Sequence, residues 1–331
     1  MTVLVTGGAG YIGSHMVLAL VDAGRDVVVL DDLSTGFGWM VHPSAHLIQG
    51  DVGDEALVAE IIQRYGVRAI VHFAGSIVVP DSVTDPLGYY LNNTVKSRAL
   101  ISAAVQNGVE HFLFSSTAAV YGEATNSPIS EATPLNPVSP YGTSKLMTEM
   151  MLRDVANAHP LRFVALRYFN VAGADPRGRS GQSTRQATHL IKVATQAALG
   201  QRSHLDIFGT DYPTPDGTCL RDYIHVSDLA YAHTLALDYL DAGGNSVVLN
   251  CGYGRGYSVL EVVEAVKRVS KVDFAVNLSP RRPGDPATLI ASAAQIREVL
   301  SWTPKLDDLD AIISHALEWE NSLKLRRLEA A

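Results

Sequence analysis

The first half of the chain alternates between short apolar runs and longer amphipathic segments. The apolar, β-branched runs at 3–6 and 26–30 are typical of strands buried on both faces of a sheet. The segment between them has a helical pattern and ends at Gly24, a residue type that often terminates helices. Continued along the chain, the pattern predicts strands at 3–6, 26–30, 46–49, 68–73, 111–115 and 161–168, and helices at 11–23, 54–65, 86–107 and 139–158. Strands that alternate with helices favour a parallel, doubly wound sheet that binds ligands at the carboxyl ends of its strands.

The pattern becomes less regular after about residue 170. Segments 173–181 and 209–217 are rich in Gly, Pro, Asp and Arg, and no Pro/Ser-rich linker separates the two halves. We therefore expect an α/β fold with a Rossmann-type doubly wound parallel sheet in residues 1–170, to which later segments can return. Residues 171–331 are expected to form a smaller, mixed α/β C-terminal lobe. The elements predicted there are helices at 188–199, 227–240 and 259–269 and a strand at 247–250.

Composition and charge narrow the function classes. With 47% hydrophobic and 18% charged residues, the 331-residue chain can form a large core and is not disordered throughout. Its 26 Lys and Arg against 34 Asp and Glu give a net charge of −8, which makes it a poor partner for nucleic acid or anionic lipid. The 11 histidines are scattered, and the sequence contains neither Cys-x-x-Cys nor His-Glu-x-x-His, so we expect no metal site.

The cysteines and the N-terminus bear on the compartment. Cys219 and Cys251 are too few to staple a chain of this length, which favours a reducing environment. The N-terminus runs from a strand directly into a glycine loop, so we expect no signal peptide. No apolar run approaches the roughly 18 residues of a membrane span. These features predict a cytoplasmic protein that does not contact membranes.

A glycine-rich loop follows the first predicted strand and opens the first helix, with the sequence Thr6-Gly7-Gly8-Ala9-Gly10-Tyr11-Ile12-Gly13. Glycines there let the backbone approach a pyrophosphate, and the helix N-terminus offers N–H groups to it. Asp31 ends the second strand, 18 residues beyond Gly13. A carboxylate at that point accepts hydrogen bonds from a ribose diol and repels a 2′-phosphate. The loop and Asp31 together predict a site for NAD rather than NADP; a tight turn without a ligand is the alternative.

Two further segments extend the expected cofactor site. Asp51 and Val52 follow the strand predicted at 46–49, where a carboxylate can accept the adenine amino group. A solvated loop position or a helix N-cap is the alternative for Asp51. Phe73-Ala74-Gly75 ends the strand at 68–73, and its small residues allow a dinucleotide to pass closely; a plain turn is the alternative there.

Tyr141 and Lys145 lie at the start of the helix predicted at 139–158, and their spacing of four places both side chains on one helical face. Tyrosine titrates near pH ~10, so it is a poor base at neutral pH. A lysine ammonium nearby stabilises the phenolate and lowers its pKa, and the positive nicotinamide of a dinucleotide would help. The strand before this helix leads into Ser115-Ser116-Thr117, whose hydroxyls can bond to the phenol or to a substrate hydroxyl. A tuned base beside a fixed hydride acceptor is what the oxidation of an alcohol requires.

These motifs resemble those of the extended short-chain dehydrogenase/reductase family and, within it, of the UDP-glucose 4-epimerases. The resemblance runs from about residue 2 to residue 320 and is carried most specifically by Asp211-Tyr212-Pro213-Thr214 and Arg221-Asp222-Tyr223-Ile224-His225, beside Tyr168-Phe169-Asn170. It implies a tightly held NAD that is reduced and reoxidised within one turnover, as UDP-glucose and UDP-galactose interconvert through a 4-keto sugar. The catalytic residues that it implies are Tyr141, which takes the proton of the 4-hydroxyl, Thr117, which bonds to the reacting oxygen, and Lys145, which holds the nicotinamide ribose.

The resemblance also implies which residues bind the cofactor and the substrate. A diphosphate favours arginine, which can grip two oxygens at once, and Arg221 and Arg282 match the diphosphate positions. An ion pair with Asp222 or another carboxylate is the alternative for Arg221, and core packing is the alternative for Phe208. The implied cofactor-binding residues are Gly7, Gly10, Tyr11, Ile12, Gly13, Asp31, Asp32, Leu33, Asp51, Val52, Phe73, Ala74, Gly75, Asn92, Ser115, Tyr141, Lys145 and Tyr168. The implied substrate-binding residues are Thr117, Tyr141, Asn170, His189, Leu190, Phe208, Arg221, Arg282, Asp285 and Leu289.

Two positions depart from the family pattern. Ile77 stands where a lysine often touches the cofactor phosphate, so cofactor retention must depend more on backbone amides. Leu289 stands where a bulky tyrosine is common beside the sugar 2-substituent. The smaller leucine predicts room for an N-acetyl group, and hence UDP-N-acetylglucosamine as a further substrate.

Other functions of the same fold are disfavoured to different degrees. A nucleotide-sugar 4,6-dehydratase needs an acid/base pair directly after Thr117, where Ala118 and Ala119 carry only methyl groups. A UDP-glucuronate decarboxylase is disfavoured less firmly, because fewer residues distinguish it. A non-catalytic NAD-sensing protein would have no use for the Thr117, Tyr141 and Lys145 set.

The resemblance further implies a homodimer. The helices predicted at 86–107 and 139–158 carry apolar residues on more than one face, and the family pairs these helices with their copies. Burial inside the monomer is the alternative explanation of the same pattern.

Overall fold

A computed structural model describes residues 1–124, 127–184, 187–282 and 284–329, with side chains through residue 324. Its centre is a seven-stranded sheet with the order β11-β6-β5-β4-β1-β2-β3, in which every neighbouring pair is parallel. The chain moves from β1 to one side of the sheet and then crosses to β4 on the other, so the crevice outside the carboxyl ends of β1 and β4 is the expected ligand site. The strands are β1 (Thr2–Thr6), β2 (Asp26–Asp31), β3 (His46–Gln49), β4 (Val67–His72), β5 (His111–Thr117), β6 (Arg162–Tyr168) and β11 (Val247–Cys251).

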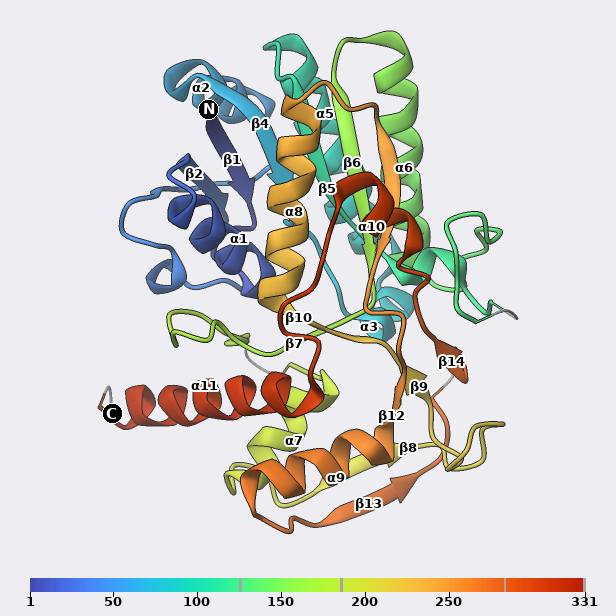
Figure 1. Cartoon of the computed structure of the whole chain (residues 1–331). Helices are drawn as coiled ribbons and strands as arrows, with labels where there is room; N and C mark the ends of the chain where they lie inside the picture. Colours follow the sequence, from blue (N-terminus) through green and yellow to red (C-terminus); the bar gives the residue numbers. More distant parts are fainter. Residues whose placement is uncertain (125–126, 185–186, 283, 330–331) are drawn as a thin grey trace.

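Helices cover both faces of this sheet (Figure 1). Helices α1 (Tyr11–Asp22) and α8 (Val226–Asp241) pack on one face, and α2 (Glu55–Tyr65), α5 (Lys96–Gln106) and α6 (Pro140–Ala158) on the other. Two buried apolar clusters correspond to the two faces, which is why the strands are apolar on both sides. The predicted Rossmann-type sheet is confirmed.

Local signals explain where helices begin and end. Asp54 caps α2 by accepting the Leu57 N–H at 3.0 Å, and Gly66 ends the helix in the left-handed region at φ 60°. The helix predicted at 86–107 is less regular than expected. It comprises α4 (Pro86–Tyr90), a π-helical turn (Leu91–Val95) and α5, and such turns are frequent at functional sites.

The C-terminal half forms a second group of elements below the sheet in Figure 1. Helices α7 (Leu190–Ala198), α9 (Val259–Ser270) and α11 (Leu309–Glu329) pack together there. The sequence pattern did not predict α11, nor the short helices α3 (Val79–Thr84) and α10 (Ala294–Leu300). Among the described residues of the lobe, three small sheets are formed: β7 (Asn170–Ala172) with β10 (Tyr223–His225), β8 (Leu205–Phe208) with β13 (Val276–Ser279), and β9 (Leu220–Arg221) between β12 (Tyr257–Ser258) and β14 (Thr288–Leu289).

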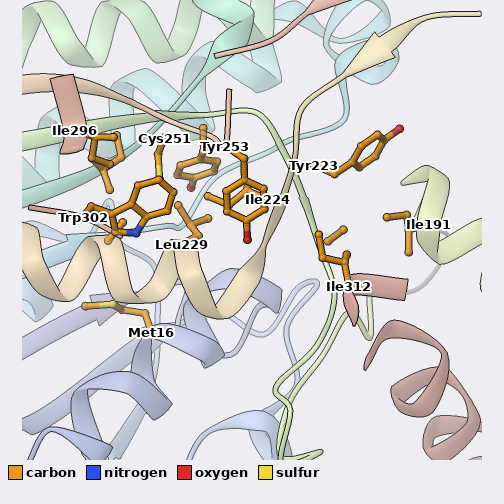
Figure 2. Close-up of a cluster of buried hydrophobic side chains, with 14 of the residues drawn as sticks. Met16, Ile191, Tyr223, Ile224, Leu229, Cys251, Tyr253, Ile296, Trp302 and Ile312 are labelled. Carbon is orange, nitrogen blue, oxygen red and sulfur yellow. The ribbon is translucent and has the colours of Figure 1, made fainter. Parts of the chain in front are cut away.

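Part of the C-terminal half belongs to the large sheet. Strand β11 is its edge strand, and α8 lies beside α1 on its face. Figure 2 shows Met16 of α1 in one apolar cluster with Leu229 of α8, Cys251 of β11 and Trp302. Both cysteines are buried and free. In the described part of the chain, none of the helices combines the length and apolarity that a membrane span requires.

Candidate functional site

The glycine loop lies at the carboxyl end of β1, against the loop that follows β4. Gly7 has φ +71°, and a Cβ there would lie 2.6 Å from the Ala74 nitrogen. A Cβ on Gly13 would lie 2.1 Å from the Gly7 carbonyl oxygen. The two loops therefore touch through backbone atoms. Helix α1 starts at Tyr11 after Gly10, which has no side chain to cap it, so the first-turn N–H groups are available to an anion.

Asp31 is buried at the end of β2, where it holds the glycine loop. Its carboxylate accepts the N–H of Ala9 and of Leu33, each at 2.9 Å. Burial raises its pKa, although these two hydrogen bonds oppose the rise. Each oxygen keeps acceptor capacity for the predicted ribose contact. The neighbouring Asp32 is exposed and accepts the Ser34 N–H at 2.9 Å.

Asp51 lies in an exposed loop and is not a helix N-cap, because Asp54 caps α2. Its carboxylate pairs with the Lys96 ammonium at 2.6 Å and accepts the Gly53 N–H at 2.8 Å. Val52 beside it is buried. This ion pair fixes the carboxylate at the sheet edge, where the adenine contact was predicted.

Tyr141 stands in the first turn of α6, which Ser139 caps by accepting the Gly142 N–H at 3.2 Å. A hydrogen bond joins Tyr141 to Thr117, the last residue of β5. Lys145, one turn further, is buried and donates to the Ser115 carbonyl at 3.0 Å. The predicted catalytic residues thus meet at the carboxyl end of β5.

The pKa values at this point differ from the sequence expectation. Burial raises the pKa of Tyr141 above 10.0, and the Thr117 hydrogen bond offsets only part of the rise. Burial also lowers the pKa of Lys145 to about 8. We expected the lysine ammonium to lower the tyrosine pKa, and this is wrong because desolvation sets the direction and the opposing contribution comes from Thr117, not from Lys145. A further positive charge beside Tyr141 is needed to make it a base.

The π-helical turn brings two asparagines to the loop after β4. Asn92 donates to the Ser76 hydroxyl at 2.9 Å. Asn93 accepts the Ser76 N–H at 2.7 Å and donates to the Ser144 hydroxyl at 3.1 Å. Asn93 therefore joins this loop to α6 beside Lys145. The sequence analysis missed it, although the Asn92-Asn93 pair inside the helix predicted at 86–107 was an available signal.

Tyr11 and Tyr168 tie the cofactor loop to the C-terminal half and to β5. Tyr11 donates its hydroxyl to the Gly173 carbonyl at 2.7 Å. The Tyr168 hydroxyl bonds to the Ser115 hydroxyl, and burial strongly raises its pKa. Both phenols are therefore structural groups that stay protonated at neutral pH.

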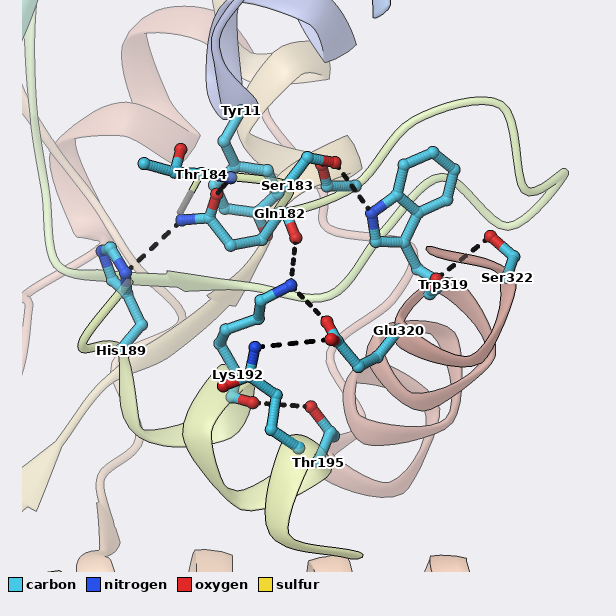
Figure 3. Close-up of polar contacts among 12 residues, drawn as sticks. Tyr11, Gln182, Ser183, Thr184, His189, Lys192, Thr195, Trp319, Glu320 and Ser322 are labelled. Atoms are coloured by element: carbon cyan, nitrogen blue, oxygen red, sulfur yellow. Dashed lines mark hydrogen bonds and ion pairs between the residues drawn. The ribbon is translucent and has the colours of Figure 1, made fainter. Parts of the chain in front are cut away.

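Three predicted substrate residues line one pocket. Asn170 in β7 and His189 and Leu190 at the start of α7 face a cavity that Tyr11 and Gly173 also line. Figure 3 shows Gln182 between Tyr11 and His189, with its amide nitrogen 3.4 Å from the His189 Nδ1. The cofactor loop and the C-terminal lobe thus share this pocket.

The other predicted substrate residues gather on β9, β14 and the end of β8. Arg221 lies opposite Leu289 in the β9–β14 register, and its guanidinium is 3.6 Å from the Asp285 carboxylate. Arg282 lies over the Phe208 ring at 3.7 Å from the centroid. Phe208 is half-buried, and the Arg282 guanidinium lies over its ring. The alternative that Phe208 serves in core packing is therefore wrong.

Asp222 does not pair with Arg221; the carboxylate that faces Arg221 is Asp285, as the alternative of an ion pair with another carboxylate allows. Its buried carboxylate accepts the N–H groups of Tyr253 and Gly254 at 2.9 Å and of Ala291 at 3.2 Å. Burial raises its pKa to about 6 despite these bonds. Arg221 has Asp285, another of the predicted substrate residues, as its neighbouring carboxylate.

The remaining positions are simple to place. Ile77 stands where the family often has a lysine, and its side chain is 49% exposed. It therefore makes no buried contact that replaces the lysine. Leu289 is half-buried against the apolar cluster of Ala118, Val120 and Tyr121 that follows Thr117. Among the residues that the structure describes, His, Cys, Asp and Glu side chains do not assemble into any group of three that could hold a metal ion.

Comparisons with known proteins agree with this geometry. The model of the NAD dependent epimerase/dehydratase family matches residues 3–252. A UDP-glucose 4-epimerase of Azospirillum brasilense is 58% identical over 97% of this chain and 92% of that protein. The crystal structure of UDP-glucose 4-epimerase from Brucella ovis in complex with NAD has a TM-score of 0.93 and 44% identity, covering 96% of this chain and 97% of that one. The UDP-Glc/GlcNAc 4-epimerase of Campylobacter jejuni has a TM-score of 0.85 and 49% identity, covering 97% of this chain and 99% of that one.

Proposed function

The chain belongs to the NAD dependent epimerase/dehydratase family, and we propose that it is an NAD-dependent enzyme that interconverts UDP-glucose and UDP-galactose at the sugar C4. The observation that carries the proposal is the meeting of Thr117, Tyr141 and Lys145 beside Gly75 in the loop after β4. Full-length relatives named UDP-glucose 4-epimerase support it.

The residues of the crevice fit NAD. The close approach of the Ala74 backbone leaves no room for a side chain on Gly7. The first turn of α1 offers its N–H groups to a pyrophosphate. Asp31 suits an unmodified ribose diol. When bound, NAD supplies a hydride acceptor that becomes the hydride donor within the same turnover.

The side chains divide the remaining work. Tyr141 accepts the proton of the 4-hydroxyl as the C4 hydride leaves, and it returns that proton when the hydride comes back to the opposite face of the 4-keto sugar. Thr117 bonds to the reacting oxygen. Lys145 is buried, and with a pKa of about 8 it is still mostly charged at neutral pH. The positive ring of bound NAD would add a second charge that lowers the Tyr141 pKa.

The C-terminal lobe binds the nucleotide part of the substrate. Arg221 and Arg282 grip the diphosphate, while Phe208 and Asp285 contact the uridine. In this proposal residues 1–170, with α8 and β11, hold NAD, and most of residues 171–331 hold the UDP-sugar. Asn170, His189 and Leu190 then lie where the two parts meet, in the pocket that they share with Tyr11.

Elimination chemistry has little support in this site. Ala118 and Ala119 follow Thr117 in a 3₁₀-helical turn (Ala118–Tyr121), and their methyl groups cannot transfer protons. The decisive assay is the conversion of UDP-glucose into UDP-galactose by the purified protein without added NAD. Tyr141→Phe should lose at least about 100-fold in kcat while it still carries NAD. An unchanged rate in this variant, or no conversion by the wild-type protein, would contradict the proposal.

UDP-N-acetylglucosamine is a second proposed substrate. Leu289 lies opposite Arg221 in the β9–β14 ladder and is smaller than a tyrosine, which leaves space beside the sugar C2. The Campylobacter jejuni relative named for both sugars supports this range. Leu289→Tyr should reduce turnover of the N-acetylated sugar and spare UDP-glucose; wild-type protein that fails to turn over millimolar UDP-N-acetylglucosamine would contradict the idea.

We further propose a cytoplasmic homodimer. The outer faces of α3, α4, the π-helical turn and α6 carry exposed apolar side chains, which burial inside the monomer does not explain. The most exposed are Val83 at 63%, Leu87 at 79%, Leu91 at 54%, Val95 at 52% and Met150 at 46%. Leu87→Glu should convert a dimer into a monomer in sedimentation experiments, and a wild-type monomer would refute the assembly.

A further inference from the structure

A buried polar network lies beneath the catalytic end of β5. Glu149 on α6 and Arg167 on β6 form an ion pair with exposed side-chain fractions of 5% each. The Arg167 Nε donates to one carboxylate oxygen at 2.9 Å and its Nη2 donates to the other at 2.5 Å. The Ser116 hydroxyl donates to the same carboxylate. One carboxylate thus joins three elements of the site.

The network occupies the positions next to the proposed catalytic residues. Glu149 is one turn after Lys145 and two turns after Tyr141, so the three side chains lie along one face of α6. Ser116 lies between Ser115 and Thr117, and it pairs with Arg167 in the β5–β6 register. Any slide of α6 along β5 that moved Tyr141 away from Thr117 would therefore also break the contacts of Glu149.

The same network continues to the substrate side. Arg167 donates through Nη1 to the Tyr121 hydroxyl at 2.9 Å, and Tyr121 donates to the Asn250 amide oxygen at 2.7 Å. Asn250 in β11 donates to the Ile129 carbonyl at 2.9 Å. The Ile129 N–H in turn bonds to the Ile290 carbonyl at 2.8 Å, next to β14. The catalytic helix and the segment that carries Leu289 are thus joined by one buried hydrogen-bonded chain.

We propose that Glu149 and Arg167 are positioning residues that hold Tyr141 and Lys145 in register with Thr117. The inference depends on the proposed function of those three residues. A buried ion pair is not needed for stability alone, because apolar residues of similar volume often stabilise a fold as well or better. A directional, bidentate pair does fix the rotation and the longitudinal position of a helix, which apolar contacts define less sharply. An error of about 1 Å at a reacting group is enough to cost about 100-fold in rate.

The test compares Glu149→Gln with Asp228→Asn in the full-length protein loaded with NAD. Asp228 is a matched control because its buried carboxylate accepts the Tyr253 hydroxyl at 2.7 Å and two backbone N–H groups of residues 305 and 306, away from α6 and β5. We measure kcat and KM for UDP-glucose well below each Tm, together with Tm and the NAD content after purification.

Glu149→Gln should lose about 100-fold in kcat, with KM within about twofold and NAD content unchanged. Asp228→Asn should lower Tm with kcat close to that of the wild type. Ser116→Ala removes one hydroxyl and keeps the ion pair. It is therefore the second variant, to be used if Glu149→Gln fails to fold. We expect it to lose about fivefold in kcat.

Two results would overturn the inference. If Glu149→Gln or Ser116→Ala lowers Tm and leaves kcat at the wild-type value, the network is only structural. If Glu149→Gln and Asp228→Asn lose the same fraction of kcat, the effect is a general loss of stability. A wild-type protein that does not interconvert the sugars overturns the proposed function itself, and the positioning role falls with it.

Discussion

At the scale of single residues, charge and burial set what each side chain can do. Burial raises the pKa of Tyr141, so its phenol is protonated at neutral pH, while Lys145 at a pKa of about 8 remains mostly charged. The nucleotide side is different: Arg282 is exposed and lies over the exposed face of Phe208. Its full charge is therefore available to a diphosphate.

Arg282 provides a prediction at this scale. Arg282→Ala should raise KM for UDP-glucose by about 10- to 100-fold and leave kcat nearly unchanged, because it removes a charged contact far from the reacting atoms. Arg281→Ala is the neighbouring control, since Arg281 already pairs with Asp211 at 2.7 Å and lies over Tyr212. Steady-state kinetics of both variants test this prediction. Equal KM values for Arg282→Ala and Arg281→Ala would show that Arg282 does not bind the substrate.

At the scale of elements, the glycine loop and the loop after β4 form a single surface. Their backbones touch at Gly7 and Ala74, and Asp31 fixes the loop from the end of β2. The π-helical turn adds a second support, since Asn93 fixes Ser76 and reaches Ser144 on α6. Four segments distant in sequence thus hold the cofactor crevice in one shape before any ligand arrives.

Gly13 tests this arrangement. Gly13→Ala places a methyl group 2.1 Å from the Gly7 carbonyl, so the loop must shift, and NAD affinity should fall by about 10- to 100-fold. Gly108→Ala is the control: it has φ +70° but nothing within 4 Å of the added Cβ. Chromatographic measurement of NAD released from each purified variant gives the answer. Full NAD content in Gly13→Ala would mean that the loop does not contact the cofactor.

The sequence predicts helices and strands correctly where residues close in sequence determine their ends. The strand–loop–helix start and the end of α2 at Gly66 are local signals, and each appears as predicted, whereas the cap of α2 is Asp54 and not the alternative Asp51. The π-helical turn, Asn93 and the partner of Arg221 depend on contacts between distant segments, for which the sequence gives no pattern. The pKa of Tyr141 was predicted wrongly for the same reason, because its burial depends on the tertiary fold.

At the scale of the whole molecule, the two halves are interleaved. Helix α8 and β11 return to the large sheet, and one apolar cluster runs from Met16 to Trp302 (Figure 2). A second connection is the buried ion pair of Lys192 on α7 with Glu320 on α11, beside the pocket that Tyr11 lines (Figure 3). We therefore expect the chain to unfold as one cooperative unit.

Buried histidines predict how this unit responds to acid. Burial lowers the pKa of His15 and His233 to about 4 and of His72 and His225 to about 3, from an ordinary value of 6.5. Below pH 6.5 the unfolded chain takes up these protons and the folded chain does not, so the stability that they contribute above that pH is lost as the pH falls toward 4. In this pH window, each histidine lowers the free energy of unfolding by up to about 1.4 kcal/mol for each unit that the pH falls.

Asp222, with a pKa raised to about 6, acts in the opposite sense, as do Asp31 and Asp307, whose pKa values burial also raises. The four histidines outnumber these carboxyls. Thermal melts at pH values from 7 to 4 should show a steep fall in Tm. Replacing the buried His233 by Leu should make this fall in Tm less steep, whereas replacing the exposed His159 by Gln should leave it unchanged. A flat Tm across this range would contradict the buried, neutral state of these rings.

The most direct measurement follows the hydrogen at C4. UDP-glucose deuterated at C4 is converted by the purified protein in ordinary water, and the UDP-galactose formed is examined by NMR. Removal and return of a captive hydride, with Tyr141 handling only the hydroxyl proton, predicts that deuterium is retained at C4. Replacement of that deuterium by solvent hydrogen would contradict the account.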